Sequence, residues 1–453
     1  MNKMSIINAN TVNGTRDFLP LDNKKRKFIF NIMRSVFEKY GFQEIETPAL
    51  ENIETLTGKY GEEGDALLFK VLNSGNYLKK IDLNIINKEN ISAFTSLIIE
   101  KGLRYDLTIP LARFVAKHQN EIIFPFKRYH IAPVWRADRP QRGRYREFYQ
   151  CDCDVVGSHS LLCEVELIQI YNEVLEKLNI EHEILINNRK ILQGLIDSYD
   201  LGNYFEKIVI IIDKWEKIGK DKVFNELENL GIEHEKVKSL LELFEIKDYN
   251  LLKSMVSNDV LNNGINELDY IFGKVSKFND KLKLTFDIKL ARGLNYYTGA
   301  ILEVKALNFE MGSIGGAGRY DNLTEIFGLK AMSGVGCSFG AERIFDIMEQ
   351  KKLFPNEILE SNTKCMFVNF SEQCEEYAFI ALQQLRMENI NAEIYPHSTK
   401  IQKQMKYADA KNIPFVIIAG EEEQKNNVFT LKNMKTGEQL QLSISEIVQK
   451  IKE

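Results

Sequence analysis

The chain has 453 residues, 44% of them hydrophobic and 27% charged, which is the composition of an ordinary globular protein with room for two or three domains. A formal net charge of −5 excludes a surface that attracts nucleic acid everywhere, so RNA binding would need a local basic patch. The polar, Asn-rich N-terminus is unlike a secretory leader, and no apolar run reaches the roughly 18 residues of a membrane helix, so we expect a cytoplasmic protein.

The first predicted elements are a helix and a strand. Residues 23–40 carry apolar side chains at helical spacing and are followed by Gly41, a typical helix stop. Residues 42–49 then alternate like a strand. Residues 71–101 are rich in Asn and Lys with short apolar runs, and we interpret them as a variable surface insertion.

The middle of the chain predicts a hairpin followed by helices. Residues 126–157 form two strand patterns joined by an Arg-rich loop at 137–143, and this region holds a local basic patch. Residues 161–178 predict an amphipathic helix. The Lys- and Glu-rich residues 188–280 are mainly helical in pattern and predict an inserted domain.

Strand character returns after the helical region. It is found at 281–288 and 296–304, with a Gly-rich turn predicted at 312–318 and a strand that leads into a helix over 334–350. Residues 351–363, with Pro355, suit a linker.

Beyond the linker, strand and helix patterns alternate. The predicted strands and helices are, in order, 365–370, 378–385, 392–395, 400–411 and 415–419. This alternation indicates a small α/β domain over 364–453, behind a larger domain at 1–355.

One face of the second strand of the hairpin carries chemistry. If residues 144–155 are extended, one side holds Arg144, Arg146, Phe148, Gln150, Asp152 and Asp154. A buried face would not hold these charges without partners, and an exposed face would not require the phenylalanine. The set fits a floor that binds a polyanion at one end and a small polar ligand at the other. A solvated strand with mutual ion pairs is the alternative.

Three further segments combine cations, aromatic residues and glycines. Residues 290–299 place Arg292 beside two tyrosines and between glycines that allow a ligand to approach closely. Residues 312–321 are Gly-rich but match neither a Walker loop nor a dinucleotide fingerprint, so a tight turn is the simpler interpretation. Residues 334–343 lead into a helix whose first turn holds Arg343, which taken alone would be a surface residue.

The cysteines give no metal signal. Cys151, Cys153 and Cys163 lie near one another in sequence, but C-x-C is weak and no second pair stands at zinc-ligand spacing. We expect these thiols to pack in the core and expect no protein metal site. Six cysteines are also too few for a disulfide framework in so long a chain.

Together these segments resemble the class II aminoacyl-tRNA synthetases, and within them the histidyl-tRNA synthetase family. Residues 23–48, 126–154 and 334–343 are similar to the three motifs that define the class. Two segments are similar to signatures of the histidine family: Arg292-Gly293-Leu294-Asn295-Tyr296-Tyr297-Thr298-Gly299 and Gly315-Gly316-Ala317-Gly318-Arg319-Tyr320-Asp321. Residues 104–108 add support, and the resemblance runs from Gly14 through the C-terminal domain.

The resemblance implies a fold and an activity. The fold is of the mixed α/β (α+β) class: an antiparallel-sheet catalytic domain at 1–355 with a helical insertion at about 188–280, and an α/β anticodon-binding domain at 364–453. The activity is that of a histidine–tRNA ligase, which activates histidine with ATP to histidyl-adenylate and transfers it to the 3′ end of tRNA(His). Mg²⁺ would assist on the phosphates, and the first motif implies a homodimer.

By the same resemblance, residues of the family motifs bind ATP. Arg136 and Arg292 would be the catalytic cations at the α-phosphate, where they also touch histidine, and Arg144 would bind the γ-phosphate. Adenine would lie between Phe148 and Arg343, an aromatic–guanidinium stack.

Other motif residues would bind histidine and tRNA. The α-amino group would be bound by Asp106, Thr108 and Gln150, with Leu107 alongside. The imidazole would be bound by Asp154, Tyr297 and Tyr296. Some family members carry Glu where Asp106, Asp138 and Asp154 stand here, so these carboxylates are one methylene shorter. The acceptor end of tRNA would meet Arg139, Gln141 and Arg142.

Two alternatives come from other functional classes. One is a synthetase-like regulatory subunit of histidine biosynthesis, the ATP phosphoribosyltransferase regulator, which binds without aminoacylating. Such proteins typically lack the C-terminal domain and the signatures around Arg292 and Tyr297, which are present here. The other is an RNA-binding scaffold that keeps the fold alone, against which Arg136, Arg292 and Arg343 argue.

Overall fold

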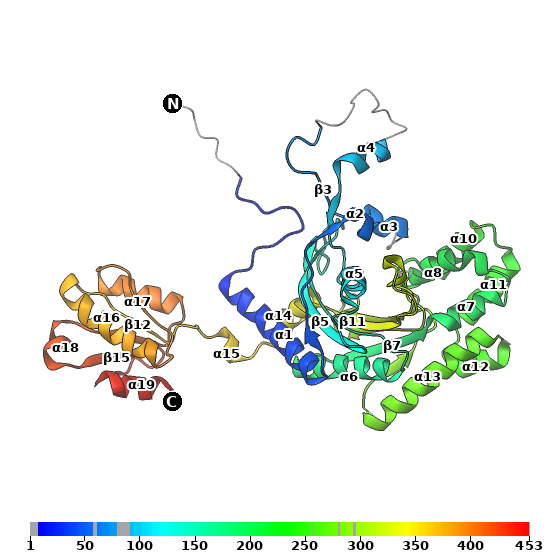
Figure 1. Cartoon of the computed structure of the whole chain (residues 1–453). Coiled ribbons are helices and arrows are strands. Elements are labelled where there is room, and N and C mark those ends of the chain that lie inside the picture. Colours follow the sequence, from blue (N-terminus) through cyan, green and yellow to red (C-terminus); the bar gives the residue numbers. More distant parts are fainter. Residues whose placement is uncertain are drawn as a thin grey trace. The chain divides into compact units, whose positions relative to one another are not determined.

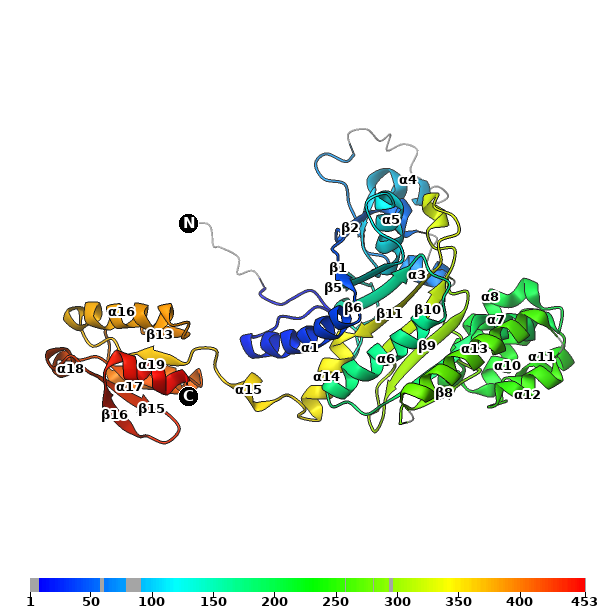
Figure 2. The same ribbon diagram turned by 60° about the horizontal axis from the view of Figure 1, so that its bottom comes forward.

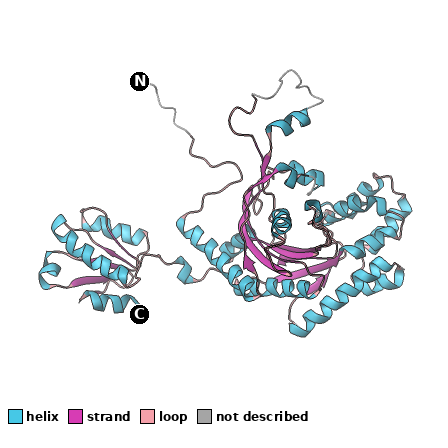
Figure 3. Cartoon of the chain, viewed as in Figure 1, coloured by secondary structure: helices cyan, strands magenta, loops and turns pink. Residues whose placement is uncertain are grey.

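The computed structural model describes residues 8–57, 61–78, 91–256, 258–279, 281–292 and 296–452, without the side chains of 61–63 and 91–93. The chain divides into two compact units, Met1–Leu353 and Phe354–Glu453, each of which has its own sheet (Figures 1 and 3). Within the described ranges, no helix has the length and apolarity needed to span a bilayer.

A large sheet forms the centre of the first unit. Among the described residues it has eight strands, in the order β1 (Gln43–Glu44), β5 (Phe126–Trp135), β6 (Glu147–Val156), β11 (Gly334–Gly340), β10 (Gly315–Tyr320), β9 (Ala300–Ala306), β7 (His182–Asn188) and β8 (Leu284–Phe286). All neighbours pair antiparallel except at the two edges, where β1 joins β5 and β8 joins β7 in parallel. The expected antiparallel sheet is confirmed.

The predicted hairpin is β5 with β6. Their register runs from Phe126 opposite Val156 to Trp135 opposite Glu147, so the Arg-rich segment forms the connection between them. Since directly opposed residues of an antiparallel pair share a face, the even-numbered side chains of both strands lie on one side of the sheet. That side is the one predicted to bind ligands.

Three helices lie beside this sheet, and the first of them packs against the other two (Figure 2). They are α1 (Pro20–Lys39), α6 (Leu162–Lys177) and α14 (Ala341–Gln350). The first two confirm the helices predicted at 23–40 and 161–178. In α1 the apolar positions Ile29, Met33 and Phe37 recur every fourth residue and are buried, which is the pattern that predicts the helix. The chain turns away at Gly41, whose φ is +83°.

The region predicted as a helical insertion is helical. It contains α7 (Arg189–Asp197), α8 (Phe205–Asp213), α9 (Trp215–Ile218), α10 (Lys220–Glu228), α11 (His234–Leu243), α12 (Tyr249–Met255) and α13 (Asp259–Phe278). Helices α7 and α13 approach closely because glycines face the contact: a Cβ at Gly194 would lie 2.6 Å from the Cβ of Leu261.

A small sheet with the strand order β2–β4–β3 is formed by residues that lie, in sequence, between strands β1 and β5 of the large sheet. It consists of β2 (Leu50–Asn52), β4 (Lys101–Leu103) and β3 (Lys70–Val71), and the helices of this region are α2 (Ile53–Leu56), α3 (Gly61–Ala66), α4 (Ile91–Ile98) and α5 (Thr108–His118). Residues 79–90 of the segment interpreted as an insertion lie outside the described residues. The strand predicted at 42–49 is limited to β1 because only two residues pair with β5.

The Gly-rich turn predicted at 312–318 is wrong: residues 315–320 form β10, an interior strand of the sheet. Glycines are needed there because neighbouring side chains occupy the space of the missing Cβ atoms. A Cβ at Gly316 would lie 2.1 Å from the Arg292 guanidinium, and one at Gly318 would lie 2.4 Å from the Tyr297 ring. Similarly, the strand predicted at 296–304 starts later, as β9.

The second unit is an α/β domain. Its sheet has the order β13 (Ala392–Ile394), β12 (Cys365–Phe367), β14 (Phe415–Ile418), β15 (Phe429–Asn433) and β16 (Gln439–Leu442), of which the first three are mutually parallel. Its helices are α15 (Asn356–Leu359), α16 (Glu372–Met387), α17 (Ile401–Ala410), α18 (Glu421–Asn426) and α19 (Ile444–Lys452). Separate apolar clusters, one with α16 and α19 and one with α17, cover the sheet. The predicted strand–helix alternation is confirmed.

Candidate active site

A cavity of about 440 Å³ opens on the ligand face of the large sheet. Its floor is formed by the neighbouring strands β6, β11 and β10, and its rim by the segment between β5 and β6 and by the start of α5 and α14. Strands far apart in sequence therefore bring residues of the second and third class motifs and of both histidine-family signatures to one place. Most of the residues predicted to bind ATP or histidine line this cavity. They are Asp106, Thr108, Arg136, Arg144, Phe148, Gln150, Asp154, Arg292, Tyr296, Tyr297 and Arg343.

Four arginines from three segments of the chain line the cavity: Arg136, Arg144, Arg292 and Arg343. Arg136 donates from Nε to the Tyr105 carbonyl at 3.1 Å, and its guanidinium carbon lies 5.2 Å from the centre of the Phe148 ring. Among the described residues, Nη1 and Nη2 of Arg136 have no hydrogen-bond or ion-pair partner. This residue is therefore fixed at one edge and keeps a charged edge for a ligand.

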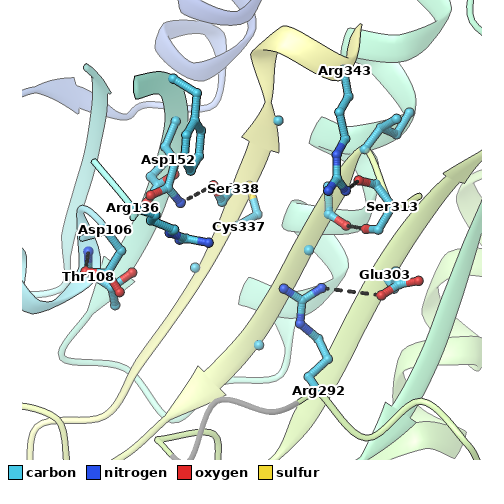
Figure 4. Close-up of a pocket in the computed structure, with 18 of the residues that line it drawn as sticks. Asp106, Thr108, Arg136, Asp152, Arg292, Glu303, Ser313, Cys337, Ser338 and Arg343 are labelled. Atoms are coloured by element: carbon cyan, nitrogen blue, oxygen red, sulfur yellow. Dashed lines mark hydrogen bonds and ion pairs between the residues drawn. The ribbon is translucent and has the colours of Figure 1, made fainter. Parts of the chain in front are cut away.

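Arg343 is held by backbone rather than by a carboxylate. It donates to the carbonyl of Gly143 at 3.0 Å and to that of Ser313 (Figure 4). Burial, with the nearby Arg144 second, lowers its pKa below the usual arginine value. An anionic ligand would relieve this repulsion between two guanidinium groups.

The Arg292 guanidinium lies over strand β10 on the cavity floor. Its Nη1 lies 3.7 Å from a carboxylate oxygen of Glu303 on β9 (Figure 4), and the guanidinium rests where a side chain at Gly316 would otherwise be. Its backbone has φ of +49°, in the left-handed region that non-glycine residues rarely adopt. Strained backbone of this kind is typical of functional sites.

Gly316→Ala tests this placement. The new Cβ would displace the Arg292 guanidinium, so we expect histidine-dependent ATP–pyrophosphate exchange to fall by about tenfold or more, since small misplacements of a positioning group are costly. Stability should change little, because the displaced group is the end of a flexible side chain. Gly273→Ala is the matched control, as nothing lies within 4 Å of the added atom on α13. Normal exchange by the Gly316 variant would contradict the placement.

Carboxylates gather at the other part of the cavity. Asp106 precedes α5 and accepts from the backbone N–H groups of Thr108 and Ile109 at 3.2 and 3.1 Å, as a helix N-cap does. Figure 4 shows Asp106 and Thr108 on the opposite side of the cavity from Arg292 and Arg343. Arg136 lies on the same side as Asp106, and Glu303 lies beside Arg292, so each side of the cavity carries charges of both signs.

Asp154 forms an ion pair with a buried arginine, a pairing that the sequence left as an alternative. Its Oδ2 lies 2.6 Å from Nη2 of Arg128, a fully buried residue directly opposite on β5, and its Oδ1 accepts from the Tyr320 hydroxyl at 2.7 Å. Burial raises the pKa of Asp154, and the Arg128 charge opposes that rise. The carboxylate both lines the cavity and neutralises a buried cation.

The two tyrosines of the first histidine-family signature, Tyr296 and Tyr297, lie above the floor. Tyr297 is buried, packs with its ring centre 4.8 Å from that of Tyr296, and stands over Gly318. Burial raises the pKa of its hydroxyl, so the group remains a neutral donor and acceptor. A neutral hydroxyl can bond either nitrogen of an imidazole.

Some predicted residues lie elsewhere. Leu107 is buried and packs with Ala132 and Val134 instead of lining the cavity. Arg146, expected on the cavity face, turns away and donates to the carbonyls of Asp138 and Asn13. The three residues predicted to meet tRNA, Arg139, Gln141 and Arg142, are exposed on the connection between β5 and β6. The six cysteines are buried free thiols, as expected for core packing.

Several cavity residues were given no role by the sequence. They include Asp152, Asp213, Glu303, Ser313 and Ser338. Alternation along β6 did place the first on the cavity face. The others come from segments whose register is visible only once the sheet is assembled.

Profiles of known families match almost the whole chain. The histidyl-tRNA synthetase profile matches residues 14–78 and 100–344, and the anticodon binding domain profile matches 364–453. The gap between the first two ranges falls within the segment interpreted as an insertion. The histidine–tRNA ligase of Porphyromonas gingivalis is 53% identical over 435 residues, 95% of this chain and 96% of the relative. That of Christiangramia forsetii is 51% identical over 441 residues, 95% and 96% respectively.

Solved structures show the same fold. The histidyl-tRNA synthetase of Nostoc sp. PCC 7120 superposes with a TM-score of 0.79 at 30% identity, covering 99% of each chain. A Bacillus halodurans structure described as an ATP phosphoribosyltransferase regulatory subunit/histidyl-tRNA synthetase gives 0.72 at 18% identity, covering 92% of this chain and 99% of that one. The second likeness concerns the fold alone.

Proposed function

Because the chain belongs to the histidyl-tRNA synthetase family, we propose that the cavity on its large sheet is where histidine and ATP react. The activity of the chain is the family's: ATP-dependent ligation of histidine to tRNA. The observation that supports the cavity as its site is that four arginines line it together with several carboxylates. ATP carries negative charge, and the α-amino group of histidine carries positive charge.

The chemistry of the first step follows from these charges. The histidine carboxylate attacks the α-phosphorus, the bond to the leaving oxygen breaks, and pyrophosphate departs with its electron pair. Both reactants are anionic, so the barrier falls chiefly by holding them together and by placing cations on the developing charge. We assign this role to Arg136 and Arg292, which reach the cavity from different segments.

Other cavity residues would hold the rest of ATP. Arg144, the exposed arginine at the rim, would bind the γ-phosphate, and the adenine would lie between Phe148 and Arg343. The backbone hydrogen bonds of Arg343 fix the plane of its guanidinium, which is what a stacking partner requires.

Mg²⁺ would enter with the nucleotide. Within the described part of the chain, no cluster of three or more His, Cys, Asp or Glu side chains could hold a metal ion, so phosphate oxygens would supply most of its ligands. Glu303, whose carboxylate lies 3.7 Å from Arg292 on the cavity lining, would be available to contribute one. Bound Mg²⁺ would neutralise phosphate charge.

Histidine would lie over β6. Its α-ammonium would be bound by Asp106, Thr108 and Gln150, and its imidazole by Asp154 and Tyr297, with Tyr296 packing behind. A neutral imidazole has one donor and one acceptor nitrogen, and a carboxylate with a hydroxyl satisfies both.

Histidine-dependent ATP–pyrophosphate exchange tests this proposal. We expect exchange with histidine and ATP together, and none without the amino acid. A protein of the same fold that only binds histidine would give no exchange. That result would remove the proposed site chemistry.

We propose that tRNA is held by two parts of the chain. Residues 364–453 would bind the anticodon, as their matching profile suggests, and exposed Arg139, Gln141 and Arg142 would meet the acceptor end. Arginines position RNA phosphates, and a glutamine amide can read a base edge. We also propose a cytoplasmic homodimer, on the resemblance of residues 23–48 to the dimer-forming motif.

Removal of residues 364–453 is expected to separate the two steps. The cavity residues all lie before residue 344, so histidine-dependent exchange should persist, while charging of tRNA at sub-saturating concentration should fall by at least about tenfold through lost binding. Both assays should be run on the truncated and the full chain at equal active-site concentration. Normal charging by the truncated chain would contradict the anticodon assignment.

A further inference from the structure

Arg189, the first residue of α7, binds the main chain near both ends of the segment 290–299. Its Nη1 donates to the Ala291 carbonyl at 3.1 Å and lies 3.5 Å from the carbonyl oxygen of Arg292. Its own backbone N–H donates to the Gly299 carbonyl at 2.9 Å. One residue of another element therefore fixes the backbone on both sides of the signature that contains Arg292.

Asn187, at the end of β7, holds the chain just before this segment. Its Nδ2 donates to the carbonyls of Ile288 and Leu290 at 3.0 and 2.9 Å, and its Oδ1 accepts from the backbone N–H of Asn188 at 2.8 Å. The side chain of Asn187 is completely buried. Residues 288–291 belong to neither a helix nor a strand, so these side-chain hydrogen bonds take the place of a backbone ladder.

The backbone held in this way is strained at Arg292, where φ is +49°. A left-handed conformation is costly for a residue with a side chain and persists only where the surrounding structure imposes it. The Ala291 carbonyl belongs to the peptide group whose orientation is set by φ of Arg292. A hydrogen bond that fixes this carbonyl therefore opposes relaxation of the strained angle.

Stability alone does not account for an arginine at position 189. The side chain is buried, and burial lowers its pKa to about 10, so the guanidinium is still charged at neutral pH. Among the described residues it forms no ion pair, and its buried Nε has no hydrogen-bond partner. A buried charge without a carboxylate partner costs folding free energy, and an apolar side chain of similar length would avoid that cost. What the arginine adds is the hydrogen bond to Ala291.

We propose that Arg189 is a positioning residue for the first step of the reaction. Its hydrogen bond to Ala291 holds the backbone of Arg292 in the conformation that places the guanidinium over β10 on the cavity floor. The inference rests on the role proposed above for Arg292 at the α-phosphate. Arg189 itself lies outside the cavity lining, so it acts through Arg292 and not on the substrates.

Arg189→Met tests the proposal with the full chain. Methionine keeps an unbranched side chain of similar length and removes the N–H donors. Histidine-dependent exchange at saturating histidine and ATP should slow by about tenfold or more, since small displacements of a positioned group are costly. The two KM values should change less than the rate, because the disturbed interaction is made in the transition state. Thermal unfolding should shift little, because a buried charge is lost together with the hydrogen bond.

A double variant with Arg292→Ala separates positioning from general packing. If Arg189 acts through Arg292, adding Arg189→Met to Arg292→Ala should change the exchange rate by less than about twofold, because the two residues act as a unit. A residue that only supports the fold would slow exchange by the same factor in both backgrounds.

Two further variants serve as controls. Arg189→Lys keeps the charge and an N–H donor but lacks the planar fork, so its rate should lie between those of the unaltered and methionine proteins. Lys236, on α11 of the same helical insertion, donates to the Tyr199 carbonyl at 3.1 Å. Lys236→Met removes the same kind of hydrogen bond away from the segment 290–299, and exchange should stay within about twofold of normal.

The outcomes distinguish this inference from the proposed function. Normal exchange by Arg189→Met, or equal slowing in the two backgrounds, would overturn it. If Arg189→Met does not fold, Arg189→Lys is compared in the two backgrounds in the same way. Failure of both variants to fold would show that the core requires Arg189, and would overturn the inference as well. Near-normal exchange by Arg292→Ala would instead remove the proposed role of Arg292, on which the inference rests.

Discussion

Arg292→Ala is expected to slow histidyl-adenylate formation by about 10²-fold or more, the usual cost of losing one preorganised charge that stabilises a transition state. The guanidinium faces Gly316 and has Glu303 at 3.7 Å as its recorded ion-pair partner, so most of its charge is available to a ligand. The effect should appear in the rate of exchange at saturating histidine and ATP. The fold should be retained, since the guanidinium adds little to the core.

Arg292→Lys is the graded control for this prediction. Lysine keeps the positive charge but lacks the planar fork that binds two oxygens at once, so its rate should lie between those of the unaltered and alanine proteins. Thermal unfolding of both variants should match that of the unaltered chain. Near-normal exchange by Arg292→Ala would remove the residue from the catalytic role.

Asp154→Ala is expected to affect both stability and histidine binding. It leaves the fully buried Arg128 without the carboxylate at 2.6 Å, and stranding a buried charge typically costs about 3–5 kcal/mol of unfolding free energy. We expect the lower part of that range, because Asp152 also interacts with Arg128. The KM for histidine should rise strongly, while the KM for ATP should stay nearly unchanged.

The double variant Asp154→Ala with Arg128→Met separates the two effects. With both charges removed, most of the lost stability should return, as replacement of a buried ion pair by apolar side chains is often neutral. The histidine KM should remain high, because the ring would still lack its acceptor. Urea unfolding and exchange kinetics with each substrate varied separately would measure this. A normal histidine KM in the double variant would show that Asp154 serves only to neutralise Arg128.

Local sequence patterns predicted correctly which side chains share one face of a single strand or helix. Alternation along β6 placed Phe148, Gln150 and Asp154 on the cavity face, since a strand that pairs on both edges keeps a strict period of two. Arg146 was misplaced because it lies before the strand begins at Glu147, where alternation no longer applies. Its side chain instead binds backbone carbonyls of other segments.

The features that the sequence analysis missed depend on contacts between residues that are far apart in the sequence. The glycines of β10 were interpreted as a turn because nothing local shows that Arg292 and Tyr297 fill the space above them. Arg319, in the same signature, was given no role, and the structure pairs it with Glu164 on α6 in a buried ion pair. Likewise Arg128 and Asp154 were not linked, because their pairing depends on the register of β5 with β6.

The position of β11 between β6 and β10 bears on how the chain is made. During synthesis the hairpin of β5 and β6 is complete at Val156, but the strand that covers the free edge of β6 ends only at Gly340. Until then the nascent chain presents an unpaired strand edge, the kind of surface that pairs wrongly with other chains. We therefore expect the late arrival of this one strand to slow co-translational folding of the large sheet, and to make the growing polypeptide prone to aggregation until most of its length has been translated.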